Sequence, residues 1–381
     1  MNKKISLGLA LSLIAVSATI TFILTSFFSL QNFNTKVVDV NEKAKKYAAL
    51  QSLDNYVREN YYGEINEEEL SDNILKGYVS GINDRYSRYL TAEEYKEEKA
   101  DHSGDLVGVG VTLTRDESGY IRIAEIFEDS PAAESGLLEN DIITAVDGTD
   151  IKELDFDEAI SRMRGIEGSE ITLTVRRSGE DKEYKFTRRS IEVSTVESKM
   201  IENNTGYIKI KSFKENTSHQ FLSALESLTA NGAKSLVFDV RDNGGGLVSS
   251  LEKCLDPLLP EGIIAVAEYK DGSSETLIYS DASEILMPMT VIVNENTASA
   301  AELFAASLVG TQTYGKGVMQ STTELDNGDA VVLTIAKYKT VFSDCYDGIG
   351  ITPDVYIENK DEKIDEQYNK AVELVQALST Q

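Results

Sequence analysis

From about Ser194 onward, short apolar strands alternate with helices, and this order is the strongest limit on how the chain can fold. Strands are predicted at 205–211, 234–240 and 289–293, and helices at 218–228, 247–258 and 362–378. Such alternation is typical of crossover units, in which helices cover the faces of a mostly parallel sheet. We therefore expect residues 191–381 to form one α/β domain that ends in an amphipathic helix.

Residues 103–190 have a different pattern, in which short strands dominate. Strands are predicted at 107–114, 120–126, 141–148 and 170–176, with short helices at 130–136 and 156–163. The strand at 141–148 ends in an Asp-Gly turn, and the first helix is closed by Gly136. The pattern predicts an α/β and α+β multidomain protein.

The N-terminus carries an uncharged, mostly apolar run from Ile5 to Leu30, preceded by Lys3 and Lys4. A helix needs about 20 apolar residues to cross a bilayer. A cleaved signal peptide would have a shorter apolar region and a small-residue exit site, and no clean exit site follows this run. The two lysines favour a cytoplasmic N-terminus. We expect residues 1–30 to be a single-pass signal anchor in the cell membrane, with the rest outside; cleavage is the alternative.

The polar segment that follows, residues 31–102, is predicted to be a helical arm. Gly81 to Ser87 is a turn signal within it, and nothing in the arm indicates chemistry. The arm and the C-terminal helix are long enough to join two subunits, so a homodimer is one expected assembly.

Composition excludes several classes of function. The net charge is −27, which argues against nucleic acid as the main partner, because phosphate binding needs clustered Lys and Arg. Cys254 and Cys345 lie far apart and form no metal-binding motif, so we expect neither a metal nor another cofactor. The only histidines are His102 and His219. A serine hydrolase built from this chain would therefore need a base other than imidazole.

Ser299 is the candidate nucleophile. It precedes a run from Glu302 to Leu308 that predicts a helix, and Ser-Ala-Ala-Glu is a capping box in which Glu302 reaches back to Ser299. A purely structural cap is thus the alternative to a catalytic role. A serine at a helix N-terminus also lies beside free backbone N–H groups, and the N–H of Ala300 could bind the oxyanion formed when Ser299 attacks a carbonyl.

Lys316 is the candidate base. The string from Gly310 to Gly317 differs at one residue from a phosphate-binding loop, because Gly317 lacks the required hydroxyl; a strand is also predicted next, which disfavours a nucleotide site. A lysine acts as a base only when neutral, and burial lowers its pKa from about 10.4. Gln320, four residues on, would share a strand face with Lys316 and orient its amine.

A glycine-rich turn, Arg241-Asp-Asn-Gly-Gly-Gly246, joins a predicted buried strand to a helix and offers a second oxyanion donor. The alternative is a tight connection without a ligand. We expect Arg241 and Asn243 to brace this turn or to bind the chain beside it.

Together these motifs resemble the carboxy-terminal processing proteases, the S41 family of serine peptidases. Thr297-Ala-Ser-Ala-Ala-Glu302 and Thr313-Tyr-Gly-Lys-Gly-Val-Met-Gln320 are similar to the family's most specific motifs. The resemblance implies a core of the crotonase and Clp-protease type. It also implies Ser299 as nucleophile, Lys316 as base, Gln320 as its orienting partner, and Gly245 and Ala300 as oxyanion donors.

Residues 103–190 resemble a PDZ domain, particularly the run from Ser130 to Gly148. The resemblance implies that the loop Leu106-Val107-Gly108-Val109-Gly110 offers its N–H groups to a peptide carboxylate, and that the groove beside it takes an extended peptide. A tight strand entry without a ligand is the alternative for these glycines. Arg164 resembles a position that couples ligand binding to activation.

The leading hypothesis is a membrane-anchored serine endopeptidase that cleaves proteins near their C-termini and captures their tails with the PDZ domain. Lys316 follows Ser299 by 17 positions, which is shorter than the family pattern by roughly two helical turns. A catalytically inactive PDZ peptide-binding scaffold is therefore the alternative.

Overall fold

The structure is a computed structural model that describes most of the chain after residue 46 and a few residues before it. The described residues are 8, 17, 19, 21–22, 24–26, 44–45, 47–281, 284–304, 308–340, 345–361 and 363–379. The chain divides into two compact units, Met1–Ser71 and Asp72–Gln381. Most of the predicted anchor lies outside the described residues. Within the described part, no helix combines the length and the apolar character needed to span a membrane.

After residue 46 the first unit contains two helical stretches, which residues 61–66 separate. Residues 47–60 are helical, as the spacing of their apolar side chains predicts. Arg58 near the end of this helix pairs with Asp54 at 2.9 Å and with Glu67 at 2.5 Å. Glu67 opens helix α2 (Glu67–Ser80), which continues into the second unit.

The prediction of a wholly helical arm over 31–102 is wrong in the second unit. Strand β1 (Arg88–Leu90) pairs antiparallel with β18 (Ala330–Thr340) before α3 (Ala92–Ser103) begins. Asp329 stabilises the pairing of β1 with β18, because it accepts hydrogen bonds from the Tyr89 hydroxyl and, at 2.8 Å, from the Ala92 amide. The turn before β1 therefore belongs to the second unit's folded core.

The β-rich domain contains an antiparallel sheet; its predicted strands at 120–126, 141–148 and 170–176 are confirmed, whereas the strands at 149–150, 180–187 and 189–192 were not predicted. The strand predicted at 107–114 is broken, because Gly110 adopts a φ of +86°. The sheet order is β3-β4-β5-β7-β8, with β6 on β5, while β2 pairs with β9. The elements are β2 (Asp105–Gly108), β3 (Val111–Arg115), β4 (Ile121–Ile126), α4 (Pro131–Ser135), β5 (Ile142–Val146), β6 (Thr149–Asp150), α5 (Phe156–Met163), β7 (Glu170–Arg177), β8 (Glu180–Thr187) and β9 (Arg189–Glu192).

The α/β domain is built on a six-stranded sheet of order β10-β11-β12-β15-β16-β19, in which all pairs except β10–β11 are parallel. Every residue of β12 is buried, as expected for a strand covered on both faces. The elements are β10 (Val196–Ile201), β11 (Thr205–Ile210), α6 (Thr217–Ala230), β12 (Ser235–Asp239), α7 (Val248–Leu255), β15 (Met289–Val293), β16 (Leu308–Gly310), β19 (Val355–Tyr356) and α8 (Glu366–Leu378).

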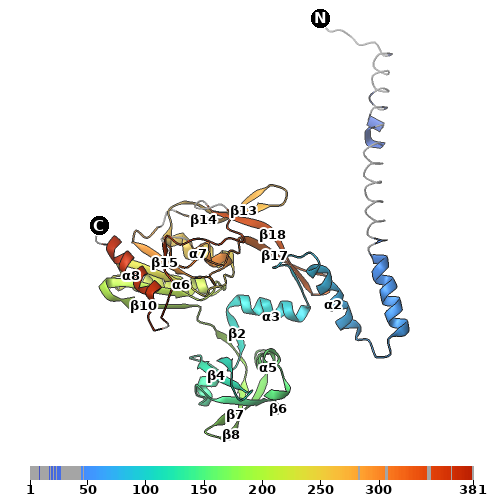
Figure 1. The fold of residues 1–381 in the computed structure, drawn as a ribbon, viewed down its shortest axis with the longest axis horizontal. Coiled ribbons are helices and arrows are strands. Elements are labelled where there is room, and N and C mark those ends of the chain that lie inside the picture. The colour runs from blue at the N-terminus through green and yellow to red at the C-terminus, as the bar shows by residue number, and fades with distance from the viewer. Residues whose placement is uncertain are drawn as a thin grey trace. The chain divides into compact units, whose positions relative to one another are not determined.

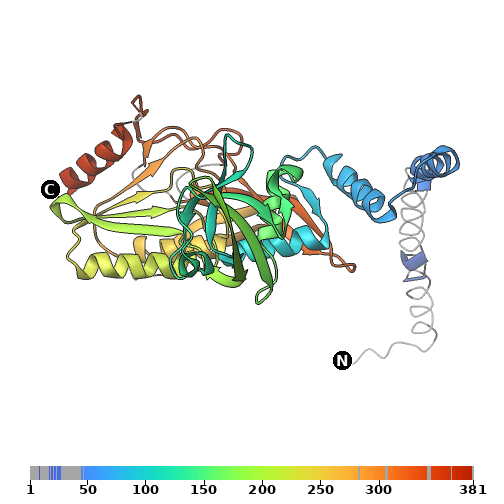
Figure 2. The same cartoon turned by 90° about the horizontal axis from the view of Figure 1, so that it is seen from below.

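The layers of this domain explain why its strands are apolar on both faces. Val237 and Ile292 pack against Ala371 and Val375 of α8. On the other face, Phe238 and its neighbours pack against α6 and α7. Figure 2 shows α8 (red) and α6 (yellow-green) on opposite sides of the sheet. A second sheet of order β1-β18-β13-β14, with β17 on β18, completes the domain (Figure 1). Its remaining strands are β13 (Gly262–Tyr269), β14 (Ser274–Ser280) and β17 (Val318–Glu324).

Arg241 holds the end of β12 to the start of α8. Its guanidinium binds both carboxylate oxygens of the fully buried Asp239, and binds Asp365, the N-cap of α8, at 2.8 Å. Burial alone would lower the pKa of Arg241, but the two carboxylates raise it above its usual value. The predicted bracing role of Arg241 is thus confirmed.

We expect Arg241→Met to lower the free energy of unfolding of the core by about 3 kcal/mol, because it leaves the Asp239 charge buried without a cation. Arg176→Met is the matched control, since its ion pair with Asp181 is exposed and is worth at most about 1 kcal/mol. Urea unfolding of both variants measures the difference, and equal losses would contradict the role given to Arg241.

Candidate active site

Three loops meet where the parallel strands β12, β15 and β16 end. Because the carboxyl ends of parallel strands lie at one edge of a sheet, side chains that follow them gather there. Thr297 ties the loops together: its hydroxyl donates to Val240 O at 2.9 Å and its carbonyl accepts from Tyr314 N at 3.0 Å. The Ala298 amide donates to Asn243 O at 3.0 Å. The fold thus brings the serine, lysine and glycine motifs to one place.

Ser299 lies in a single 3-10 turn (Ser299–Ala301) rather than at the start of the predicted helix. The helix prediction is wrong for residues 302–304, which form a turn; residues 305–307 lie outside the described part. The next described element is strand β16, which begins at Leu308. Ser299 itself has a φ of +56°, which costs a non-glycine residue about 1–2 kcal/mol.

Only half of the predicted capping box forms. The Glu302 carboxylate does reach back and accepts a hydrogen bond from Ser299 N at 2.8 Å. The reciprocal bond is replaced, because Glu302 N donates to Ser299 O at 2.9 Å and the N-cap residue is Ala298. The side chain of Ser299 lies near the Tyr338 hydroxyl instead, and burial raises the pKa of Tyr338 to about 12. The hydroxyl of Ser299 is therefore not used as a helix cap.

Glu302 links the serine to the lysine. Its carboxylate is 2% exposed and accepts four hydrogen bonds. One oxygen binds Ser299 N and Lys316 N, each at 2.8 Å; the other binds the Thr313 hydroxyl at 2.6 Å and Gly315 N at 2.8 Å. The amide nitrogens of Ser299 and Lys316 thus lie within about 5.6 Å of each other, twice the shared bond length. The short segment between them does not separate their backbones.

The Lys316 side chain is half-buried, and its pKa lies below the usual value. Burial is the main cause and the charge of Arg88 adds to it, while Glu302 and Asp84 oppose the shift. Its Nζ lies 4.8 Å from the centre of the Tyr86 ring. Among the described residues it makes no hydrogen bond to the Ser299 hydroxyl. The environment favours the neutral amine, but the proton-transfer contact is not formed.

Gln320 does not share a strand with Lys316. β17 begins at Val318, and the pairing of β17 with β18 shifts register between Met319 and Gln320. Alternation along a strand therefore does not relate the two side chains. The Gln320 amide nitrogen donates to the Thr334 hydroxyl at 3.1 Å, and Thr334 in turn donates to Asp84 at 2.7 Å. An orienting role of Gln320 on the Lys316 amine stays a prediction.

The two predicted oxyanion donors lie side by side. A Cβ on Gly245 would stand 2.9 Å from Ser299 Cβ and 3.0 Å from Ala300 N, and the φ of Gly245 is +102°, so only glycine fits. No described residue accepts a hydrogen bond from the Ala300 amide. The Gly245 amide is occupied, because it donates to Asn243 Oδ1 at 2.8 Å. Asn243 therefore braces the turn, as predicted, and also competes for one of its donors.

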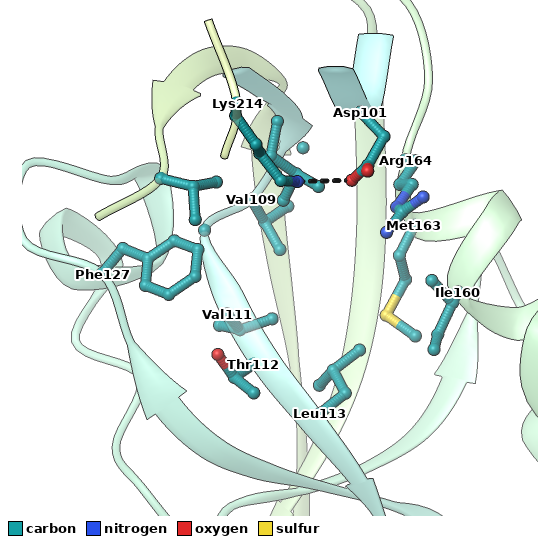
Figure 3. A pocket seen from close by; sticks show the side chains of 14 residues that line it. Asp101, Val109, Val111, Thr112, Leu113, Phe127, Ile160, Met163, Arg164 and Lys214 are labelled. Atoms are coloured by element: carbon teal, nitrogen blue, oxygen red, sulfur yellow. Dashed lines mark hydrogen bonds and ion pairs between the residues drawn. The ribbon is translucent and has the colours of Figure 1, made fainter. Parts of the chain in front are cut away.

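The predicted peptide-binding residues line a pocket of about 280 Å³ beside β3 (Figure 3). Leu106, Gly108, Val109, Gly110 and Arg164 all contribute to it, whereas Val107 does not. Its walls include the apolar side chains of Val111, Leu113, Phe127, Ile160 and Met163. β3 is the edge strand of its sheet, which leaves one side of it open for strand addition.

Comparison with known proteins gives the same assignment. Residues 204–357 match peptidase family S41, and residues 122–177 match the PDZ domain. The chain is 31% identical to the carboxy-terminal processing protease CtpA of Bacillus subtilis over 92% of this chain and 77% of that protein. It is 32% identical to a CtpA-like serine protease of Staphylococcus aureus over 92% of this chain and 72% of that protein.

The chain belongs to peptidase family S41. It is a serine-type peptidase of the carboxy-terminal processing group. A solved structure from Bacteroides fragilis that is assigned to the S41 proteases shares the fold, with a TM-score of 0.52 and 17% identity over 84% of this chain and 92% of that one.

Sequence reasoning missed the surroundings of Lys316 in this S41 core. Tyr86 and Arg88 come from the turn and strand before α3, which were interpreted as a chemically inert arm. Asp84 accepts hydrogen bonds from Ser87 and Thr334, which hold its pKa below the usual value although burial would raise it. No local signal marks these residues, because their partners lie more than two hundred positions away. Glu302 was visible, but only as a helix cap.

We expect Glu302→Gln to lower the free energy of unfolding of the S41 core by about 2–4 kcal/mol. The amide nitrogen cannot accept, so two of the four donors lose their partner and face another donor. Peptidase activity falls with it, because the backbones of Ser299 and Lys316 lose their common partner. Urea unfolding and hydrolysis of a casein substrate measure the two effects.

Glu295→Gln is the matched control for this change. Glu295 lies in the same loop and accepts one exposed hydrogen bond from Thr311 at 2.8 Å. Its replacement is expected to change stability by less than about 0.5 kcal/mol. A Glu302→Gln variant as stable as this control would contradict the role of Glu302 in holding Ser299 and Lys316 together.

Proposed function

We propose that this S41 peptidase is a membrane-anchored endopeptidase that cleaves proteins near their C-termini, with Ser299 as nucleophile and Lys316 as general base. The observation that carries the proposal is the Glu302 carboxylate, which holds Ser299 N and Lys316 N on one oxygen. The lowered pKa of Lys316 supports it, since only a neutral amine can accept the serine proton.

In this mechanism the Lys316 amine removes the proton from Ser299 Oγ as that oxygen attacks the scissile carbonyl carbon. The carbonyl oxygen gains the negative charge, and the amide of Ala300 donates to it. The resulting ammonium of Lys316 then gives its proton to the leaving amine as the C–N bond breaks. Water, deprotonated by the same amine, hydrolyses the acyl-serine and releases Ser299.

The described arrangement is a resting one in this proposal. Two catalytic groups have internal partners: the Lys316 amine lies over Tyr86, and the Gly245 amide donates to Asn243. Catalysis requires Lys316 to leave the Tyr86 ring and approach Ser299 Oγ to about 3 Å. The lysine side chain is long enough for this movement without displacement of its backbone.

The PDZ domain captures the C-terminal tail of the substrate in the pocket beside β3. The apolar lining, the open edge of β3 and the glycine-containing loop before it support this role. The name of the Bacillus subtilis relative, a carboxy-terminal processing protease, agrees with a substrate recognised at its C-terminus. The partners proposed for this chain are thus polypeptides with free, accessible C-termini.

Anchoring in the membrane rests on the sequence at the N-terminus. Ile5 to Leu30 is long and apolar, and Lys3 and Lys4 favour a cytoplasmic start. The peptidase core then lies on the extracytoplasmic side, where it meets exported proteins.

We expect the full-length chain to shorten a folded reporter that carries an unstructured apolar C-terminal tail, and to spare the same reporter without the tail. Ser299→Ala and Lys316→Ala are each expected to reduce cleavage about a thousandfold or more, because nucleophile and base act as a unit. Mass spectrometry of the products locates the cleavage. Retained cleavage in Ser299→Ala, or no cleavage by the unaltered chain, would contradict the proposal and favour a peptide-binding scaffold.

The rate of cleavage should rise with pH, because Lys316 must lose its proton to act as a base. Arg88 lowers the pKa of Lys316, so Arg88→Met raises that pKa and moves the rising limb of the pH–rate profile to higher pH. Lys96→Met, which removes a positive charge from the exposed face of α3, should leave the limb in place. A limb that does not move in Arg88→Met would contradict Lys316 as the base.

A further inference from the structure

One end of the PDZ pocket carries positive charge from two domains. Arg164 is the C-cap of α5 in the PDZ domain, whereas Lys214 follows β11 in the peptidase core. Both line the pocket. The guanidinium of Arg164 has no hydrogen-bond or ion-pair partner among the described residues. An apolar cavity with two cations at its end is complementary to an anion that has an apolar neighbour.

Backbone donors lie beside these cations. The loop between β2 and β3 is held through its carbonyls: Val109 O accepts from Ala132 N at 2.8 Å, and Gly110 O accepts from Phe127 N at 3.0 Å. Within the described part of the chain, the amides of Val109 and Gly110 have no acceptor. Both residues are buried, so their N–H groups need a partner from outside the fold.

One of the two cations, Lys214, is already paired with a carboxylate of this chain. Lys214 Nζ binds Asp101 Oδ1 at 2.6 Å, and Figure 3 shows this pair at the end of the pocket, beyond the apolar side chains. The Asp101 side chain is 53% exposed, whereas that of Lys214 is 21% exposed. Asp101 is thus the solvated, replaceable member of the pair, and Lys214 is the member fixed against the pocket.

We propose that Lys214 binds the C-terminal carboxylate of the captured peptide, together with Arg164 and the amides of Val109 and Gly110, and that Asp101 occupies Lys214 until the peptide arrives. The inference rests on the proposed capture of substrate tails and assigns part of that site to the peptidase core. The occupant is a free α-carboxylate whose last side chain is apolar, because Met163, Phe127 and Leu113 line the same cavity.

The exchange of one carboxylate for another explains how the site stays closed to other ligands. An exposed ion pair contributes at most about 1 kcal/mol, so a peptide that also places an apolar side chain in the cavity displaces Asp101 readily. A peptide that ends in an amide brings no charge and must leave Lys214 with Asp101. The Lys214 site therefore selects true C-termini over internal segments.

The test is peptide binding to the full-length Ser299→Ala chain in detergent, measured by fluorescence anisotropy. The probe is a labelled peptide that ends in Val-Ala-Leu, either with a free carboxylate or as the C-terminal amide. We expect the free carboxylate to bind at least about tenfold more tightly, and Lys214→Met to remove most of this preference, since a hydrogen bond to a charged group is worth about that factor. Asp101→Asn should tighten binding of the carboxylate form about threefold and leave the amide form unchanged.

Lys211→Met is the matched control, because Lys211 is three residues away, pairs with Glu197 at 2.5 Å and does not line the pocket. It should keep the full carboxylate preference. A preference that survives in Lys214→Met would overturn this inference and leave peptide capture intact. Binding of neither peptide would overturn the proposed capture and this inference together.

Discussion

The carboxylate of Glu302 is the interaction on which the peptidase site depends. It is buried, and four donors converge on its two oxygens, three of them from the segment 313–316. A hydrogen bond to a charged group contributes about 1.5–3 kcal/mol, so the four outweigh the conformational freedom of the loop. The loop in turn carries Lys316, and the fourth donor is the amide of Ser299.

The four hydrogen bonds of Glu302 also explain how Ser299 and Lys316 can lie close together although few residues separate them in sequence. In a chain whose catalytic residues are placed by successive helices and strands, a loss of two helical turns displaces one residue from the other. Here a side chain fixes both backbones at once, and the length of the connection through 305–307 no longer decides their separation. Ser299 lies in a 3-10 turn with a left-handed backbone, and the next described element is β16 from Leu308.

The sequence pattern predicted those helices and strands that are determined by residues within the element itself. The helix α4 has Ser130 as its N-cap and Gly136 as its left-handed C-cap, and both were visible in the sequence. The apolar strand β12 was recognised because both of its faces are buried. Strand β1 was missed, because the partner that makes Arg88–Leu90 a strand is β18, far along the chain. The turn at residues 81–87, whose composition indicated no chemistry, is brought to the peptidase site by the same pairing of β1 with β18.

In the candidate site, too, the local motifs were predicted and the distant partners were missed. Ser299, Lys316, Gly245 and Ala300 were named from motifs, and the fold brings their backbones together. The partners of their side chains could not be named, since Tyr86, Arg88 and Tyr338 reach the site only through β1 and β18. The alternation argument for Gln320 failed because β17 begins only at Val318 and its register shifts before Gln320, and no residue type indicates either.

Two groups of the proposed catalytic and peptide-binding sites have partners within the fold. A buried donor without an acceptor costs about 1–3 kcal/mol, so such an internal partner lowers the free energy of the chain without substrate. Asn243 Oδ1 accepts from the Gly245 amide, and Asp101 pairs with Lys214. Exchanging such a partner for a substrate oxygen is nearly neutral, because one hydrogen bond replaces another. The two ends of the system are also close along the chain: Lys214 adjoins Phe213, whose amide donates to Gly245 O at 2.9 Å. In the proposed capture, a carboxylate that replaces Asp101 on Lys214 thus binds next to Phe213, which is hydrogen-bonded to the turn beside Ser299.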